Sequence, residues 1–153
     1  MIRTEKRLRL CTALLIVNIA FIWGNSLLPG EVSGAFSDWV KELLAQLFAS
    51  DDISTSSGGL LRKLAHFSEF AMLGILFSWR FGMLQKQKIW AAACGFLTAC
   101  VDETIQRFVP DRGPSIWDVG IDTCGVLTGM LVFFIGHSIL VKRTNHSLEE
   151  NQT

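Results

Sequence analysis

The sequence predicts an all-α fold: a bundle of four transmembrane helices with one additional amphipathic helix between the first and second spans. Two observations carry this prediction. Half of the 153 residues are hydrophobic, and they gather in four long runs separated by short polar segments. A shorter segment after the first run places its apolar residues at the spacing of one helical face. At this length we expect a single membrane domain, residues 1–153.

The four apolar runs are long enough to cross a bilayer, which needs about 20 residues of helix. We expect spans at about 8–28, 60–79, 89–108 and 116–141. Pro29 and Gly30 end the first span, and the tail from Thr144 onward is expected to be frayed. Basic residues before the first run resemble the start of a signal peptide. The run continues to Leu28 without a clear small-x-small cleavage site, so we predict that this helix is retained.

The amphipathic helix is expected at about 35–49. Its apolar residues recur on one helical face from Phe36 to Phe48, whereas Asp38 and Lys41 lie off that face. The segment is too polar to span a membrane. We predict that it lies in the membrane interface on the outer side, roughly parallel to the membrane. Packing against its own protein is the alternative.

The basic residues predict the orientation, because cytoplasmic loops of membrane proteins are enriched in Lys and Arg. Nine of the 14 basic residues would face one side of a four-span chain: Arg3, Lys6, Arg7, Arg9, Arg80, Lys86, Lys88, Lys142 and Arg143. We therefore expect a multi-pass protein with both termini in the cytoplasm. Because no basic stripe lies outside the N-terminal run, we expect no nucleic-acid partner.

The cysteines are predicted to be packing residues. All four lie inside apolar stretches and none forms a CxxC pair: Cys11, Cys94, Cys100 and Cys124. The sequence therefore predicts neither a disulfide nor a zinc site of the CxxC type.

Ionisable residues interrupt the second, third and fourth runs at a similar depth, in the half of the membrane facing away from the cytoplasm. A charge at the centre of a spanning helix costs about 2.5–3.5 kcal/mol, so these side chains must face one another or a water-filled cavity. Six are expected to converge on one pocket open to the outside: His66, Glu69, Glu103, Arg112, Asp118 and Asp122. Asp102 and Glu103 are adjacent, about 100° apart on a helix, so only one should point straight into a shared site.

This cluster contains more acidic than basic side chains. Its basic members are Lys63, Arg107 and Arg112, with His66 only when protonated. Either some carboxyl groups are protonated, or a cation or cationic ligand completes the site. One histidine among oxygen donors is weakly diagnostic of a metal, so we predict no metal and no other cofactor.

Each charged residue also has a structural explanation. Arg107 can pair with Glu103 within a helix, Asp118 can complement a helix dipole, and Lys63 can reach the interface. Gly125 and Gly129 lie on the same helical face as Asp118. A neighbouring helix can therefore approach closely at these two glycines. A homo-oligomer through these two glycines is a further expectation.

Three strings carry a resemblance to a known family: KLAHFSEF at 63–70, DETIQRFVPDRGPSIWD at 102–118 and DTCGVLTG at 122–129. The chain resembles the VanZ-like family of bacterial integral membrane proteins over about residues 8–140. The resemblance implies a bacterial cytoplasmic membrane protein of the cell envelope and the following motif positions: Lys63, His66, Glu69, Glu103, Gln106, Arg112, Asp118, Asp122 and Gly125. The family takes its name from a glycopeptide-resistance cluster, where its member lowers susceptibility to teicoplanin.

Three functions are open. In the first, the pocket binds an envelope lipid, glycolipid or cell-wall precursor through five ligand-binding residues: Lys63, Asp102, Gln106, Arg112 and Asp118. Arg112, in the turn before the last span, could then donate two parallel hydrogen bonds to a carboxylate or phosphate.

A further alternative function is that of a proton- or cation-coupled carrier.

The second function is a membrane enzyme acting on a lipid-linked substrate. Its candidate catalytic residues are His66, Glu69, Glu103 and Asp122. His66 would be the general base, oriented by Glu69 or Asp122. Ser68 and Ser115 are the candidate nucleophiles, although each is more often a helix or cap serine.

Overall fold

The computed structural model describes residues 2–48, 58–113 and 115–150, and every regular element in these ranges is a helix. The elements are α1 (Ile2–Ser26), α2 (Gly30–Phe48), α4 (Gly58–Met83), α5 (Lys88–Gln106) and α6 (Ile116–Glu150). The predicted all-α fold class is therefore confirmed for the described residues.

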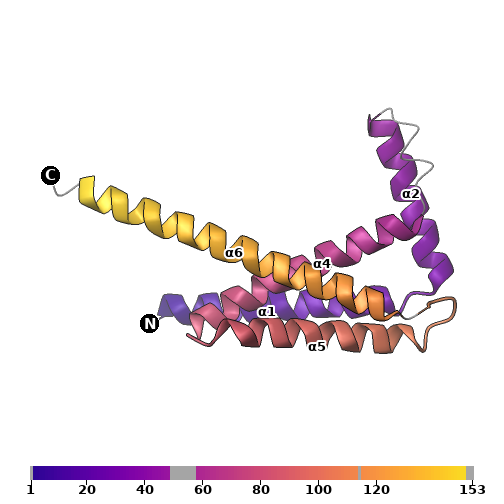
Figure 1. Cartoon of the computed structure of the whole chain (residues 1–153), viewed down its shortest axis with the longest axis horizontal. Coiled ribbons are helices and arrows are strands. Elements are labelled where there is room, and N and C mark those ends of the chain that lie inside the picture. The colour runs from indigo at the N-terminus through magenta and orange to yellow at the C-terminus, as the bar shows by residue number, and fades with distance from the viewer. Residues whose placement is uncertain (1, 49–57, 114, 151–153) are drawn as a thin grey trace.

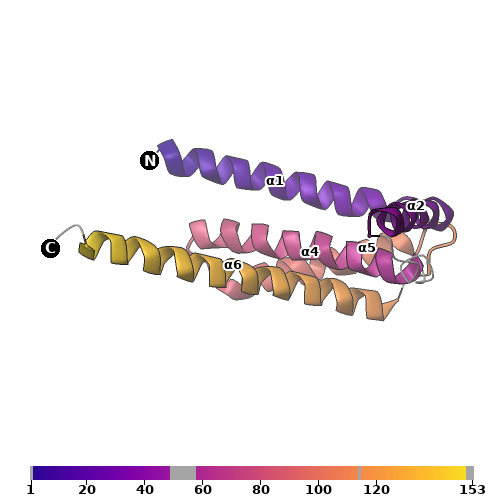
Figure 2. The ribbon, with the colours of Figure 1, turned by 90° about the horizontal axis from the view of Figure 1, so that it is seen from above.

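Four of the helices, α1, α4, α5 and α6, form an elongated bundle in which the chain reverses direction from one helix to the next (Figures 1 and 2). Both termini and the turn between α4 and α5 lie at one end. The opposite end holds α2 and the turn between α5 and α6. There α2 leaves the bundle at a steep angle to the other helices (Figure 1).

The helix α2 begins five residues earlier than predicted, directly after Pro29. Proline is compatible with a helix start, and its carbonyl accepts a hydrogen bond from Ser33 N–H at 3.1 Å. Gly30 is required there because a Cβ atom would collide with the backbone carbonyl of Asp111. Gly30 N–H also donates to the Pro110 carbonyl at 3.2 Å, which joins α2 to the turn before α6.

The apolar face predicted for α2 is described only in part. Its described member Trp39 is exposed, and so is Leu43. The side chains of Phe36, Val40, Leu44, Leu47 and Phe48 lie outside the described residues. The helical state of the segment is confirmed, whereas its place in the membrane interface stays a prediction.

The prediction that the tail is frayed from Thr144 onward is wrong, because α6 continues to Glu150. No Gly or Pro interrupts the chain beyond Gly136, and Lys142, Arg143 and Leu148 are good helix formers. The polar composition of the tail therefore does not end its helix.

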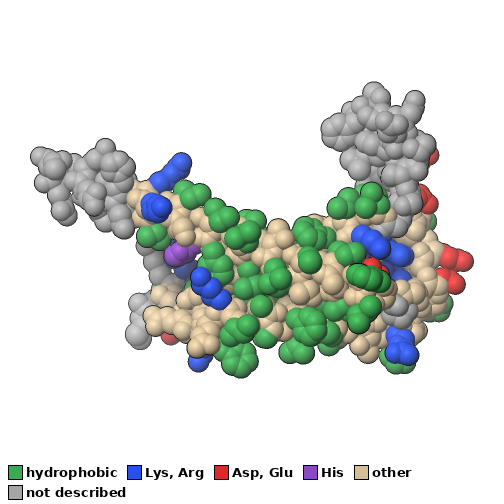
Figure 3. Space-filling view, in the orientation of Figure 1, with side chains coloured by type: hydrophobic (Ala, Val, Ile, Leu, Met, Phe, Trp, Pro, Cys, Tyr) green, Lys and Arg blue, Asp and Glu red, His purple; other side chains and the backbone are tan. Residues whose placement is uncertain are grey.

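Two segments are long and apolar enough to cross a membrane by length and composition, Thr4–Ser26 in α1 and Ile116–Thr144 in α6. Large apolar side chains are nevertheless exposed on all four bundle helices, for example Val17, Leu64, Leu97 and Leu131. Figure 3 shows such side chains over the middle of one face and Lys and Arg toward its two ends. A surface of this kind suits a lipid environment.

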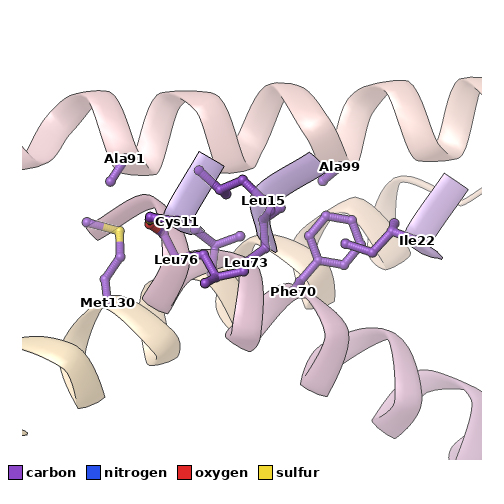
Figure 4. Packing of buried hydrophobic residues seen from close by; sticks show 10 residues of the cluster. Cys11, Leu15, Ile22, Phe70, Leu73, Leu76, Ala91, Ala99 and Met130 are labelled. Atoms are coloured by element: carbon purple, nitrogen blue, oxygen red, sulfur yellow. The ribbon is translucent and has the colours of Figure 1, made fainter. Parts of the chain in front are cut away.

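The buried apolar core is small and centres on α4 (Figure 4). Phe70, Leu73 and Leu76 of α4 belong to one cluster with Cys11, Leu15 and Ile22 of α1. Ala91 and Ala99 of α5 point toward this cluster, where their small side chains leave room for the larger residues.

Helices α4 and α6 approach each other closely, backbone against backbone, at two glycines. A Cβ atom on Gly74 would collide with the backbone of Val126, and one on Gly129 would collide with the backbone of Ala71. The close helix approach predicted at Gly125 and Gly129 is thus confirmed, with α4 as the neighbour. Both glycines are buried against α4, and a homo-oligomer stays a prediction.

All four cysteines carry free thiols. Cys11 is fully buried in the core, as predicted, and its thiol donates a hydrogen bond to the Leu76 carbonyl at 3.6 Å. The packing role predicted for Cys124 is wrong, because this side chain is exposed on α6.

Candidate functional site

The predicted site lies at the end of the bundle where α2 leaves it, and Asp102 of α5 is its most buried carboxylate. The Asp102 Oδ1 atom accepts a hydrogen bond from Ser26 Oγ at 2.6 Å, and Oδ2 accepts one from Gln106 Nε2 at 2.9 Å. Gln106 Nε2 also lies 3.3 Å from Ser26 Oγ, which it reaches as a second acceptor. The three side chains form a closed polar group between α1 and α5.

His66 of α4 stands between carboxylates from two other helices. Its Nδ1 atom is 3.8 Å from Asp102 Oδ2 and 3.9 Å from Asp122 Oδ1. Both separations exceed hydrogen-bonding distance, which ends near 3.2 Å for such pairs. Asp122 is 1% exposed, and its Oδ2 has no hydrogen-bond partner among the described residues.

Glu103 holds the start of α6. Its Oε2 accepts a hydrogen bond from Ser115 N–H at 2.9 Å, and Ser115 Oγ accepts one from Trp117 N–H at 3.2 Å. The second bond makes Ser115 the N-cap of α6. Asp102 and Glu103 point toward different neighbours, as two adjacent positions about 100° apart on a helix must. Because the two side chains point about 100° apart, Asp102 faces α1 and Glu103 faces the start of α6.

Arg112 folds back from the turn before α6 onto the end of α1. Its Nε donates to the Leu28 carbonyl at 3.1 Å, and its Nη2 donates to the Asn25 carbonyl at 2.9 Å. These acceptors belong to the carbonyl-rich C-terminal end of a helix, which favours a cation. Burial lowers the pKa of Arg112 from its ordinary value. Its two parallel donors are thus engaged with backbone, and the buried Nη1 has no partner in the described part of the chain.

The remaining predicted residues lie around this centre. Glu69 Oε1 accepts a hydrogen bond from Asn25 Nδ2 at 2.9 Å. Lys63 Nζ is 3.7 Å from Asp118 Oδ1, and both side chains are partly exposed, so this ion pair is weak.

Two cavities adjoin the cluster. The first, called here the inner cavity, measures about 20 Å³ and is lined by Arg62, Lys63, His66, Glu103, Gln106, Asp118, Ile121 and Asp122. The second, called here the lateral cavity, measures about 350 Å³ and is lined by Phe21, Asn25, Leu28, Val32, Ser33, Arg62, Ala65, His66, Glu69 and Arg112. His66 and Arg62 line both. The predicted site residues therefore surround His66 on two sides instead of lining one pocket.

Two residues of the site, Asn25 and Ser26, were missed by sequence reasoning. Asn25 and Ser26 form a polar pair in the last turn of an otherwise apolar helix, which is the signal that could have identified them. Arg62 lies one helical turn before His66, on the same face.

Among the described residues, one group of three side chains brings metal-ligating atoms close together. Ligand atoms of His66, Asp102 and Asp122 all lie within 4.8 Å of one another, and each comes from a different helix.

Comparison with known proteins adds one match. A protein-family model described as VanZ/LLP1 matches residues 11–139, a range that contains every site residue described above. No curated protein and no solved structure matches the chain.

Proposed function

The chain belongs to the VanZ/LLP1 family, and we propose that it is a four-span protein of the bacterial cytoplasmic membrane. Its function, in this proposal, is to bind the anionic head group of an envelope lipid, glycolipid or cell-wall precursor in the lateral cavity. Because a cell-wall precursor at the outer surface is what a glycopeptide antibiotic meets, such binding would alter susceptibility to teicoplanin.

The proposal of four spans rests on the packing of α4 and α5 alongside the two segments that are apolar enough to cross. At a rise of about 1.5 Å per residue, the 19 residues of α5 extend roughly 28 Å, close to the hydrocarbon thickness of a bilayer. Exposed side chains on these helices include Leu64, Met72 and Leu97. Asp102 and Glu103 are buried against neighbours, so the cost of their charge in lipid is avoided.

Labelling of engineered cysteines tests the orientation. The turn that contains Gln87 lies at the same end as both termini and is flanked by Lys86 and Lys88, which favours the cytoplasm. We expect a membrane-impermeant maleimide to label Glu31→Cys in intact spheroplasts and Gln87→Cys only after permeabilisation. Both positions are exposed, and the wild-type chain measures the background from native thiols. Labelling of Gln87→Cys in intact spheroplasts would refute the proposed topology.

The lateral cavity is the observation that carries the binding function. Its volume of about 350 Å³ falls in the range of small-molecule sites. Phe21, Leu28 and Val32 provide apolar contact, and Arg62 and Arg112 provide positive charge. Arg112 is held in place by two backbone carbonyls, and its third nitrogen, Nη1, is buried with no hydrogen-bond partner among the described residues. Apolar surface beside two arginines suits an amphiphile with a phosphate or carboxylate head group.

Binding is favoured over nucleophilic catalysis because both candidate nucleophiles have other partners. Ser68 Oγ donates to the Ala65 carbonyl of its own helix at 2.8 Å and is exposed. Ser115 Oγ caps α6. Neither hydroxyl forms a hydrogen bond with His66 among the described residues, so the nucleophile–base pair of a serine enzyme is missing there.

Replacing Arg112 tests the binding function. Lysine keeps the charge but cannot hold two carbonyls and a ligand at once, so Arg112→Lys should weaken binding of a polyprenyl phosphate about tenfold or more. The measurement is the dissociation constant in phosphatidylcholine nanodiscs. Arg107→Lys is the matched control, because Arg107 is exposed and lines neither the inner nor the lateral cavity. Equal affinities of the two variants, or a wild-type protein that does not bind the lipid, would contradict the proposal.

A further inference from the structure

The side chains of His66, Asp102 and Asp122 bring one nitrogen and two carboxylate groups to one point between α4, α5 and α6. We propose that these three residues bind a divalent transition-metal cation such as Mn²⁺ or Zn²⁺. The sequence argued against a metal because one histidine among oxygen donors is weak evidence by itself. The structure adds that ligand atoms from three different helices lie close together, which the spacing of these residues in the sequence could not show.

The separations within the triad fit a shared ion better than direct hydrogen bonds. His66 Nδ1 is 3.8 Å from Asp102 Oδ2 and 3.9 Å from Asp122 Oδ1. Metal ligands lie about 2.0–2.6 Å from the ion, which places two neighbouring ligand atoms roughly 3–4.5 Å apart. Side chains that attract each other directly would close to about 3 Å.

Buried carboxylate oxygens without partners give an independent indication that a ligand belongs here. Asp122 Oδ2 is buried and accepts no hydrogen bond from the described residues. The same holds for Glu103 Oε1, which lies outside the triad on a side chain that is 8% exposed. Both residues line the inner cavity. Carboxylate oxygens removed from water in this way need a donor or a cation, because their desolvation is otherwise uncompensated.

The inner cavity is large enough for one water molecule. Its volume of about 20 Å³ exceeds the roughly 10–15 Å³ that a single water molecule requires. A cation bound by the triad could therefore keep one water molecule in this cavity as a further ligand, as ions with few protein ligands commonly do.

Two of the nearby cationic side chains have other partners. Lys63 pairs with Asp118, and Arg112 donates to backbone carbonyls at the end of α1. Asp102 is hydrogen-bonded on both oxygens, which fixes its orientation in the way that outer contacts fix metal ligands. Imidazole with carboxylates suits Mn²⁺, Zn²⁺ or Fe²⁺ better than Ca²⁺, which prefers oxygen ligands alone.

The cation would also contribute to head-group binding in the lateral cavity, and this part of the inference rests on the function proposed above. His66 and Arg62 line both cavities, so an ion at the triad lies beside the lateral cavity. A divalent cation there would attract the oxygens of a phosphate head group together with the two arginines. Cation binding itself does not require that step, because all three protein ligands are present without a lipid.

The test uses the full-length protein in phosphatidylcholine nanodiscs, stripped with a chelator and titrated with Mn²⁺ alone, with bound ion followed by electron paramagnetic resonance. We expect one Mn²⁺ per chain. Asp122→Asn should weaken binding about tenfold or more, because it removes a charged ligand without breaking a hydrogen bond recorded for that side chain. Asp118→Asn is the matched control, since Asp118 lines the same cavity but lies outside the triad. Circular dichroism shows that each variant is folded.

The outcomes separate the two proposals. The absence of stoichiometric Mn²⁺ binding overturns the cation site, as does an equal loss of affinity in Asp122→Asn and Asp118→Asn. Repeating the titration with a polyprenyl phosphate in the nanodiscs tests the shared role. Cation binding without lipid binding supports the triad and rejects the lateral cavity. Lipid binding that is insensitive to bound Mn²⁺ supports the lateral cavity and rejects only the shared role.

Discussion

Gly129→Ala is expected to destabilise the folded protein by about 3 kcal/mol, or to prevent its accumulation in the membrane. The added methyl group would collide with the backbone carbonyl of Ala71 on α4. Backbone cannot rotate away as a flexible side chain can, so α6 must move off α4. That movement would also displace Asp122 from His66. The measurement is reversible unfolding in mixed detergent micelles, followed by far-ultraviolet circular dichroism.

Gly136→Ala is the matched control for this prediction. Gly136 lies on the same helix, and a Cβ atom there meets nothing within 4 Å. Alanine is favoured over glycine in helices by up to about 1 kcal/mol, so this variant should be as stable as the wild type or slightly more stable. If both variants unfold at the same detergent fraction, α4 and α6 do not pack as closely as the structure has them.

Ser26→Ala should cost about 1–2 kcal/mol of unfolding free energy, the second-largest effect we expect. The substitution removes the 2.6 Å hydrogen bond to Asp102 and the acceptor that Gln106 reaches at 3.3 Å. Neutral hydrogen bonds between membrane helices average about 0.6 kcal/mol, whereas bonds to charged groups in proteins contribute about 1.5–3 kcal/mol. A value near the upper figure would show that Asp102 is ionised when the protein is folded.

Ser68→Ala controls for the loss of a serine hydroxyl. Ser68 is exposed and bonds only within its own helix, to the Ala65 carbonyl, so its replacement should change stability by less than about 0.5 kcal/mol. An equal effect of the two variants would mean that the contact between α1 and α5 contributes nothing to stability. A larger loss for Ser26→Ala in the chelator-treated protein than in the Mn²⁺-loaded protein would connect this contact to the cation site.

The helices could be predicted from local sequence because their signals are local. The apolar runs and the helical periodicity of the α2 segment are properties of neighbouring residues, and all five helices occur where they were expected. The ends were less predictable. Pro29 and Gly30 read equally well as the end of one helix or the start of the next, and the contact of Gly30 with Asp111 decided between them.

The candidate site could be predicted as a set of residue types but not as a set of contacts. A charged residue in an apolar helix must be shielded whatever its partner is, so His66, Glu69, Asp102, Glu103 and Asp122 could be named together. Asn25 and Ser26 could not, because neutral polar residues near a helix end carry little cost there.

The sequence by itself determined which helices form and which side chains must be shielded from lipid. Both follow from residue type and spacing. Only the tertiary structure decided the pairings. Arg112 lies on the carbonyls of α1 instead of a carboxylate, and Asp102 and Glu103 serve different neighbours. These pairings depend on how far α6 approaches α4 and how each helix is rotated. Both are set by contacts such as Gly129 with Ala71, between residues that are distant in the chain.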